Sequence, residues 1–141
     1  MSRRPVAGVA VGDELPALTV RLGRGDLVRY AGASGDFNPI HWDEAAALAI
    51  GLPGVVAHGM LSMAQAARVL TDWAGDPGAV VEYSTRFTKP VVVPPGPETA
   101  ELVVTGRVTE LLDGGRVRVE LTATSAGVKV LGVARAVLQL A

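Results

Sequence analysis

Hydrophobic and polar residues alternate along much of the second half of the chain, and this pattern predicts β-strands. The alternation runs through residues 81–88, 102–109 and 116–123. A period of two is typical of strands that bury one face. Glycine-containing turns at residues 113–115 and 125–127 separate the later segments and predict hairpins.

The last apolar segment, residues 128–140, has hydrophobic residues on both faces of the expected strand. A strand with two apolar faces lies at the centre of a sheet or is covered by a partner. Nearer the N-terminus, residues 15–22 predict a first strand after a loose lead-in over residues 1–13.

Short helices are predicted in the first half of the chain. Residues 23–33 have helical spacing, and Asp26 is the expected N-terminal cap. Asp43 is expected to cap a second short helix that extends through Ile50, where Gly51 and the residues after it stop the helix. Between the two helices, residues 34–42 are expected to form a loop.

The helix predicted over residues 60–70 is apolar around most of its circumference. Its polar exceptions, together with one residue beyond it, form one narrow stripe: Ser62, Gln65, Arg68 and Asp72. A helix of this kind must be buried on most sides, and it is too short to span a bilayer. The sequence therefore predicts one α+β domain over residues 1–141, with a curved antiparallel sheet wrapped around one buried central helix.

Composition narrows the possible functions. The chain has 141 residues, of which 49% are hydrophobic and 19% charged, which is typical of a packed globular domain. A net charge of −1 gives no basic surplus for binding nucleic acid or an anionic membrane. The absence of cysteine excludes disulfides and thiolate chemistry and fits a cytoplasmic location. The N-terminus lacks the pattern of a signal peptide or of a membrane span.

Candidate chemistry concentrates between residues 30 and 63, where both histidines lie. Asp36, Asn38 and His41 fall in one short loop whose backbone Pro39 restricts. Two interpretations remain open from these residues alone. The segment is either an Asx turn with no chemical role, or a loop that presents an acid, an amide and an imidazole together.

A metal site is a further alternative for these residues. Asp36, His41 and His58 together offer three possible zinc ligands, but the chain has no closely spaced histidine pair, so the expectation is that no metal binds.

Three ordered motifs resemble those of the MaoC-like hydratases and dehydratases, a family with the hot-dog fold. They are GDFNPIHWD at residues 35–43, AHGM at residues 57–60 and RFTKPV at residues 86–91. The resemblance extends from about Val11 to the end of the chain and looks strongest to the catalytic B subunit of the (3R)-hydroxyacyl-carrier-protein dehydratases. The chain departs from the family pattern at residues 94–98, beside the expected acyl tunnel, and at Ala67, where many relatives have serine.

The resemblance implies reversible addition of water to a trans-2-enoyl thioester, giving a (3R)-hydroxyacyl thioester. Asp36 and His41 would activate the water, and the Gly59 amide at a helix start would stabilise the enolate oxygen. Asn38, His58 and Met60 are the expected substrate-binding residues. For His58 a structural role, bonding a loop carbonyl, stays open, and Met60 could instead fill the core or line the tunnel.

The resemblance also implies an acyl-CoA or acyl-carrier-protein substrate, no cofactor, and a homodimer or a heterodimer with a second hot-dog subunit. Two rival functions remain. The chain could be a non-catalytic subunit that binds the acyl chain for a partner, or it could be a hot-dog thioesterase.

Overall fold

A computed structural model describes residues 2–141. Its main element is an antiparallel sheet with the strand order β1-β3-β4-β6-β2, to which β5 adds a short pairing with β4. The strands are β1 (Glu14–Leu22), β2 (Val80–Phe87), β3 (Ala100–Leu112), β4 (Arg116–Ser125), β5 (Val128–Lys129) and β6 (Leu131–Gln139). The helices are α1 (Arg24–Ser34), α2 (Glu44–Ala49) and α3 (Gly59–Ala74), with short 3-10 turns η1 (Pro39–His41) and η2 (Pro77–Ala79).

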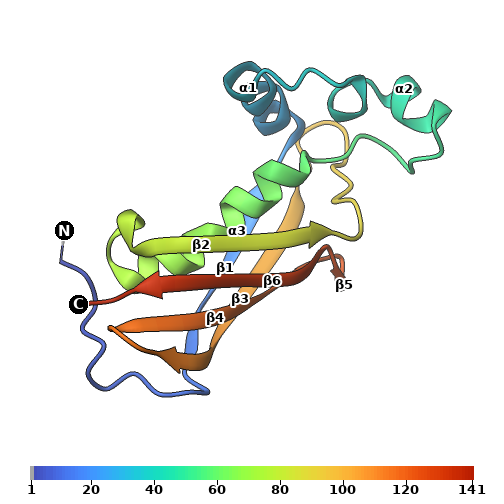
Figure 1. The fold of residues 1–141 in the computed structure, drawn as a ribbon. Helices are drawn as coiled ribbons and strands as arrows, with labels where there is room; N and C mark the ends of the chain where they lie inside the picture. Colours follow the sequence, from blue (N-terminus) through green and yellow to red (C-terminus); the bar gives the residue numbers. More distant parts are fainter. Residues whose placement is uncertain (1) are drawn as a thin grey trace.

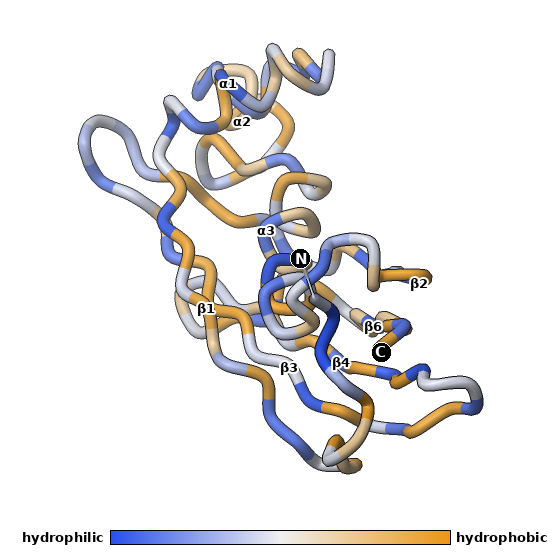
Figure 2. Tube along the Cα trace, turned by 90° about the vertical axis from the view of Figure 1, so that its left-hand side faces the viewer, coloured by the Kyte–Doolittle hydropathy of each residue, from blue (hydrophilic) through white to orange (hydrophobic). Residues whose placement is uncertain are grey.

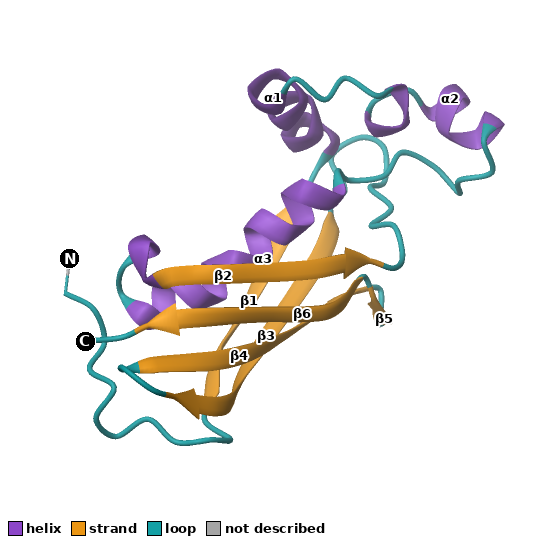
Figure 3. Ribbon diagram, in the orientation of Figure 1, coloured by secondary structure: helices purple, strands orange, loops and turns teal. Residues whose placement is uncertain are grey.

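The long helix α3 lies across one face of the curved sheet, while α1 and α2 gather beyond its N-terminal end (Figure 1; Figure 3). Leu70 and Ala66 on α3 are fully buried, as are Leu102 and Val104 on β3. The expected architecture of a sheet wrapped around a central helix is therefore confirmed. Among residues 2–141, no helix combines the length and apolarity needed to cross a membrane.

The alternating segments of β3 and β4 form strands with one buried face, as predicted. Val108, Val117, Val119 and Ala123 are all fully buried, and hydrophobic and hydrophilic stretches alternate along both strands in Figure 2. The turn after β3 is also confirmed, because Gly114 and Gly115 both have positive φ angles.

The prediction for β2 was wrong in one respect, because its apolar face is buried only in the middle, where Tyr83 packs against the core. Val81 is 52% exposed and Phe87 is 54% exposed. The physical reason is that β2 is an edge strand, paired on one side to β6. The prediction that the central helix is buried on most sides was also incomplete, because the single chain leaves part of α3 uncovered. On α3, Met60 is 56% exposed and Ala64 is also exposed, so part of the apolar circumference is uncovered in the single chain.

The last predicted strand is divided in two. β5 ends at Lys129 and β6 begins at Leu131. β6 lies between β4 and β2, which confirms the central position expected from its two apolar faces. Val133 has a φ of 49°, which is rare for a β-branched residue, and it lies where the β2–β6 register is irregular.

Two details near the N-terminus also differ from the prediction. Gly23, and not Asp26, is the N-cap of α1; Asp26 occupies the third helical position, and its side chain accepts a hydrogen bond from the Gly23 amide. The lead-in is not loose, because the Arg4 amide donates to Ala74 and the Val6 amide to Ala141. Asp43 caps α2 as expected, accepting hydrogen bonds from two amides of its first turn.

Candidate active site

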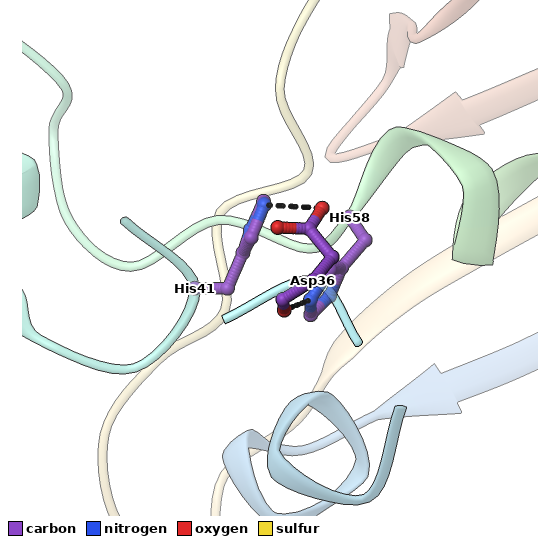
Figure 4. A group of neighbouring side chains, drawn as sticks. All are labelled: Asp36, His41 and His58. Carbon is purple, nitrogen blue, oxygen red and sulfur yellow. Dashed lines mark hydrogen bonds and ion pairs between the residues drawn. The ribbon is translucent and has the colours of Figure 1, made fainter. Parts of the chain in front are cut away.

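The loop between α1 and α2 is shaped by its own polar side chains. Asp36 Oδ1 accepts a hydrogen bond from the Asn38 amide at 3.1 Å, and Asn38 Oδ1 accepts one from the Ile40 amide at 3.3 Å. These two Asx-type bonds, together with Pro39 at the start of η1, turn the chain sharply. The Asx turn weighed against a functional loop is thus present, and it is also what directs the Asp36 carboxylate toward His41 (Figure 4).

His41 is buried, with 7% of its surface exposed, and its ring is fixed by the backbone. Nδ1 lies 2.6 Å from the Val56 carbonyl oxygen. Because a carbonyl can only accept, Nδ1 carries a proton, and in the neutral form of the ring Nε2 has a free lone pair. Nε2 faces Asp36 Oδ2 at 3.8 Å, which is too long for a direct hydrogen bond (Figure 4). The imidazole and the carboxylate, which is 52% exposed, therefore face each other across a narrow gap.

His58 contacts both of these residues, through a hydrogen bond to Asp36 and ring stacking on His41. Its Nε2 donates to the backbone carbonyl of Asp36 at 3.1 Å, and its ring stacks on the His41 ring with centroids 3.7 Å apart. Tyr30 contacts the His58 ring edge-on at 4.7 Å. Burial lowers the pKa of His58 below its usual value, and nearby His41 lowers it further, while the Asp36 carbonyl opposes the shift. The surroundings of His58 therefore favour its neutral form.

Gly59 begins α3, so its amide lies at the helix N-terminus. The N-cap residue, His58, makes no side-chain capping bond, and the first amides of a helix have no partner within it. A side chain at position 59 would clash with Phe87 where its ring now lies, since an added Cβ would lie 2.8 Å from that ring. Glycine thus keeps this amide end close to the last residue of β2.

A cavity of about 320 Å³ lies against His41 and the start of α3. His41, Gly59 and Ser62 line it beside a wall that is mostly apolar: Ile40, Leu52, Val56, Val91 and Leu131. The imidazole and the helix start therefore face one common, largely apolar space. Such a cavity suits an acyl group whose reacting end meets a few polar groups.

The three expected substrate-binding residues are not among the residues that line this cavity. The Asn38 side chain caps η1, the His58 ring bonds the Asp36 carbonyl, and Met60 is exposed on the outside of α3. Of the three expected catalytic residues, His41 and Gly59 line the cavity. Asp36 does not line it, but its carboxylate lies 3.8 Å from His41 Nε2.

A metal ion does not fit this arrangement, although ligand atoms of Asp36, His41 and His58 lie within 4.8 Å of one another. The two imidazole rings are stacked with an interplanar angle of 21°. Their nitrogen lone pairs lie in the ring planes, so two nearly parallel rings cannot both direct a lone pair at one ion about 2.0 Å away. One nitrogen of each ring is also hydrogen-bonded to a backbone carbonyl.

Several residues that shape the site escaped the sequence analysis as site residues. Tyr30 packs on His58, Val56 orients His41, and Phe87 would clash with a side chain at position 59. Trp42 donates from Nε1 to the Phe37 carbonyl at 3.0 Å and braces the loop. Ser62, assigned to a polar stripe, is 3% exposed and lines the cavity. Among these, only Phe87 and Trp42 stand inside quoted motifs, and their partners are distant in sequence or are backbone atoms.

Comparison with known proteins defines the class. The MaoC like domain family matches residues 7–126, and the chain therefore belongs to the MaoC-like family. Over 79 residues it is 43% identical to 3-hydroxyacyl-thioester dehydratase X of Mycobacterium tuberculosis; the match covers 56% of this chain and 27% of that protein. The chain thus matches about a quarter of this relative's length.

Two solved structures confirm the hot-dog fold expected from the motifs. A MaoC-like dehydratase superposes with a TM-score of 0.94 at 42% identity, over 99% of this chain and 43% of the other. The R-hydratase PhaJ1 from Pseudomonas aeruginosa superposes with a TM-score of 0.83 at 31% identity, over 98% of this chain and 86% of the other. The second likeness extends over nearly the whole of both chains.

Proposed function

We propose that this protein is a hydro-lyase that adds water to trans-2-enoyl thioesters and, in reverse, dehydrates (3R)-hydroxyacyl thioesters. One observation carries the proposal: the His41 imidazole and the N-terminus of α3 at Gly59 face one apolar cavity, with the Asp36 carboxylate 3.8 Å from His41. The names of the similar proteins, a 3-hydroxyacyl-thioester dehydratase and an R-hydratase, support the same reaction.

Water activation falls to Asp36 and His41. Since His41 Nδ1 carries the proton, Nε2 can take a proton from a water molecule held between it and Asp36. The pair then delivers that proton to the α-carbon of the enolate, which completes the addition of water. In the dehydration direction the pair removes the α-proton and passes it to the leaving hydroxyl group. At 3.8 Å, Asp36 Oδ2 and His41 Nε2 do not hydrogen-bond to each other. Both atoms are therefore available to hydrogen-bond to one water oxygen.

Charge stabilisation falls to Gly59. As water adds to the β-carbon, negative charge develops on the thioester oxygen. An unpaired amide at the start of α3, together with the positive end of the helix dipole, opposes that charge. The mostly apolar cavity wall strengthens this interaction by keeping water away.

The geometry refines the roles proposed for the other three residues. Asn38 shapes the loop through its bond to the Ile40 amide, and His58 positions Asp36 and His41. Both therefore support substrate binding indirectly. Met60 is proposed to meet a second subunit, because it is exposed next to the site.

We infer that this partner is a second hot-dog chain, identical or not. The edge strand β2 exposes Val81 and Phe87, and α3 exposes Met60 and Ala64. Uncovered apolar residues along one edge strand and the helix beside it favour pairing with another chain. A cytoplasmic location, suggested by the cysteine-free sequence, belongs to the same proposal.

The test is turnover of trans-2-enoyl-CoA by the purified chain, followed by loss of the conjugated enoyl absorbance. Asp36→Asn removes the carboxylate charge at nearly constant shape, and His41→Ala removes the base. Each change is expected to lower kcat by about 10²-fold or more while the thermal transition stays cooperative. Full activity in either variant contradicts the assignment.

A further inference from the structure

Ten of the chain's thirteen basic side chains have a partner within the described part of the chain. Six form ion pairs, and four hydrogen-bond to a carbonyl or amide oxygen. Among residues 2–141, the structure gives no hydrogen bond or ion pair to the side chains of the three others, Arg86, Lys89 and Lys129, which are all exposed. The last two are the only lysines of the sequence. We call Arg86, Lys89 and Lys129 the rim cations.

The rim cations come together at one end of the sheet, beside the cavity. Lys89 lines the cavity itself. Thr88, its neighbour, donates from its hydroxyl to the Lys129 carbonyl at 3.2 Å and from its amide to Val130 at 3.1 Å. Arg86 pairs with Gly132 across β2 and β6. Thr88 and Val130 also line the cavity, so the three cations are neighbours of its wall.

Acidic residues are absent from these two segments. Residues 84–93 and 126–133 contain the three rim cations and no aspartate or glutamate. The rest of the chain has ten basic and fourteen acidic side chains, so its formal net charge is −4, and the positive surplus is local to these two segments. An unbalanced positive charge that is confined to the rim of the cavity favours a ligand that brings its own negative charge.

We propose that the rim cations bind a phosphate group on the pantetheine arm of the thioester substrate. This inference rests on the proposed function. If the acyl group lies in the cavity with its thioester at Gly59, the arm must leave the cavity along its wall. Coenzyme A and acyl carrier proteins both place a phosphate at the far end of that arm, outside the space that holds the reacting carbons. Lysines are suitable point charges for such a phosphate, and arginine adds a forked donor.

The test compares three substrates with the same enoyl group: the coenzyme A thioester, the 4′-phosphopantetheine thioester and the phosphate-free pantetheine thioester. The variant is Lys89→Gln combined with Lys129→Gln, which removes both charges but keeps polar side chains of similar reach. Arg116→Gln is the matched control, because Arg116 is a basic residue at the start of β4 whose side chain bonds to the Asp113 carbonyl.

For the double variant, kcat/KM is expected to fall about tenfold with both phosphate-bearing substrates, through KM, as two partly exposed ionic contacts would give. The phosphate-free substrate should show no change, and the control should match the wild type with all three. A fall with the coenzyme A thioester alone contradicts the inference, because it assigns the charges to the phosphates of the adenosine portion and not to the phosphate on the arm. A fall with 4′-phosphopantetheine assigns them to the phosphate shared with carrier proteins.

An equal loss with the phosphate-free substrate overturns the inference, and so does unchanged KM with every substrate. Turnover of the phosphate-free thioester by the wild type tests the proposed chemistry separately, since no rim contact is needed for it. Binding of free 4′-phosphopantetheine, measured by calorimetry, gives a readout that does not depend on turnover. The double variant should bind it about tenfold more weakly.

Discussion

Gly59→Ala is the substitution that tests most directly why glycine begins α3. The backbone of Gly59 does not require a positive φ angle, and alanine is a better helix former than glycine. The obstacle is steric, because the new Cβ would lie 2.8 to 2.9 Å from three atoms of the Phe87 ring. Either the ring moves or the start of α3 moves.

The expected magnitudes differ for stability and for activity. Overpacking of this kind costs about 1 to 3 kcal/mol, and the low end applies because Phe87 is 54% exposed and can turn outward. Activity is more sensitive, since displacing one oxyanion donor costs about 3 kcal/mol, or about 10²-fold in kcat. We therefore expect a folded protein, slightly destabilised and nearly inactive.

A double-mutant cycle separates the clash from other effects. Phe87→Leu alone should keep most of the activity. In the Gly59→Ala/Phe87→Leu variant, kcat should be at least tenfold higher than in Gly59→Ala, because the smaller side chain leaves space for the methyl group. Enoyl hydration rates and thermal melts of the four proteins form the assay. Wild-type activity in Gly59→Ala, or strictly additive losses in the cycle, would refute the reasoning.

Two further predictions concern stability. Because burial lowers the pKa of His58, the unfolded chain binds a proton there more readily, so stability should fall as pH drops below about 6.5. Denaturant titrations from pH 7.5 to 5 should show that the free energy of unfolding depends less on pH in His58→Gln than in the wild type. An equal pH dependence in the two proteins would count against a neutral, buried His58. Asp43→Ala should cost about 1 kcal/mol, because it removes the cap that accepts from the Ala45 and Ala46 amides; equal denaturation midpoints would disprove the capping role.

The parts of the fold that depend on a single chain could be predicted from the sequence. The alternation along β3 and β4 was a sound guide, because one face of each strand packs against α3 and the core of the same chain. The alternation along β2 predicted the strand but not its exposure, since Val81 and Phe87 both stay more than half exposed in the single chain. The hydrophobic pattern of a strand does not show whether its own chain or a partner chain covers the apolar face.

The candidate site was foreseeable as a set of residues, but its geometry was not. The motifs proposed Asp36, His41 and Gly59 as candidates, yet the orientation of His41 depends on the Val56 carbonyl, fifteen residues away. The role of His58 depends on ring stacking and on the Asp36 carbonyl, twenty-two residues away. Such backbone contacts leave no mark on side-chain patterns, because any residue type supplies the same carbonyl.

The N-cap of α1 is a second feature that the sequence did not predict correctly, although all the residues involved are close in sequence. Asp26 was expected to precede α1, and it lies within the first turn. An acid at either position satisfies a backbone amide near the helix start, so the residue type alone cannot distinguish the two. The glycine three residues earlier provides the actual cap.

The central claim is that this site adds water across the enoyl bond and leaves the thioester intact. One time course of trans-2-enoyl-CoA with the purified protein can follow two quantities at once: the enoyl absorbance and the amount of free thiol. We predict that the absorbance falls, that no thiol is released, and that Asp36→Asn abolishes the change. Release of thiol in step with substrate loss, or an enoyl absorbance that stays constant, would contradict the account.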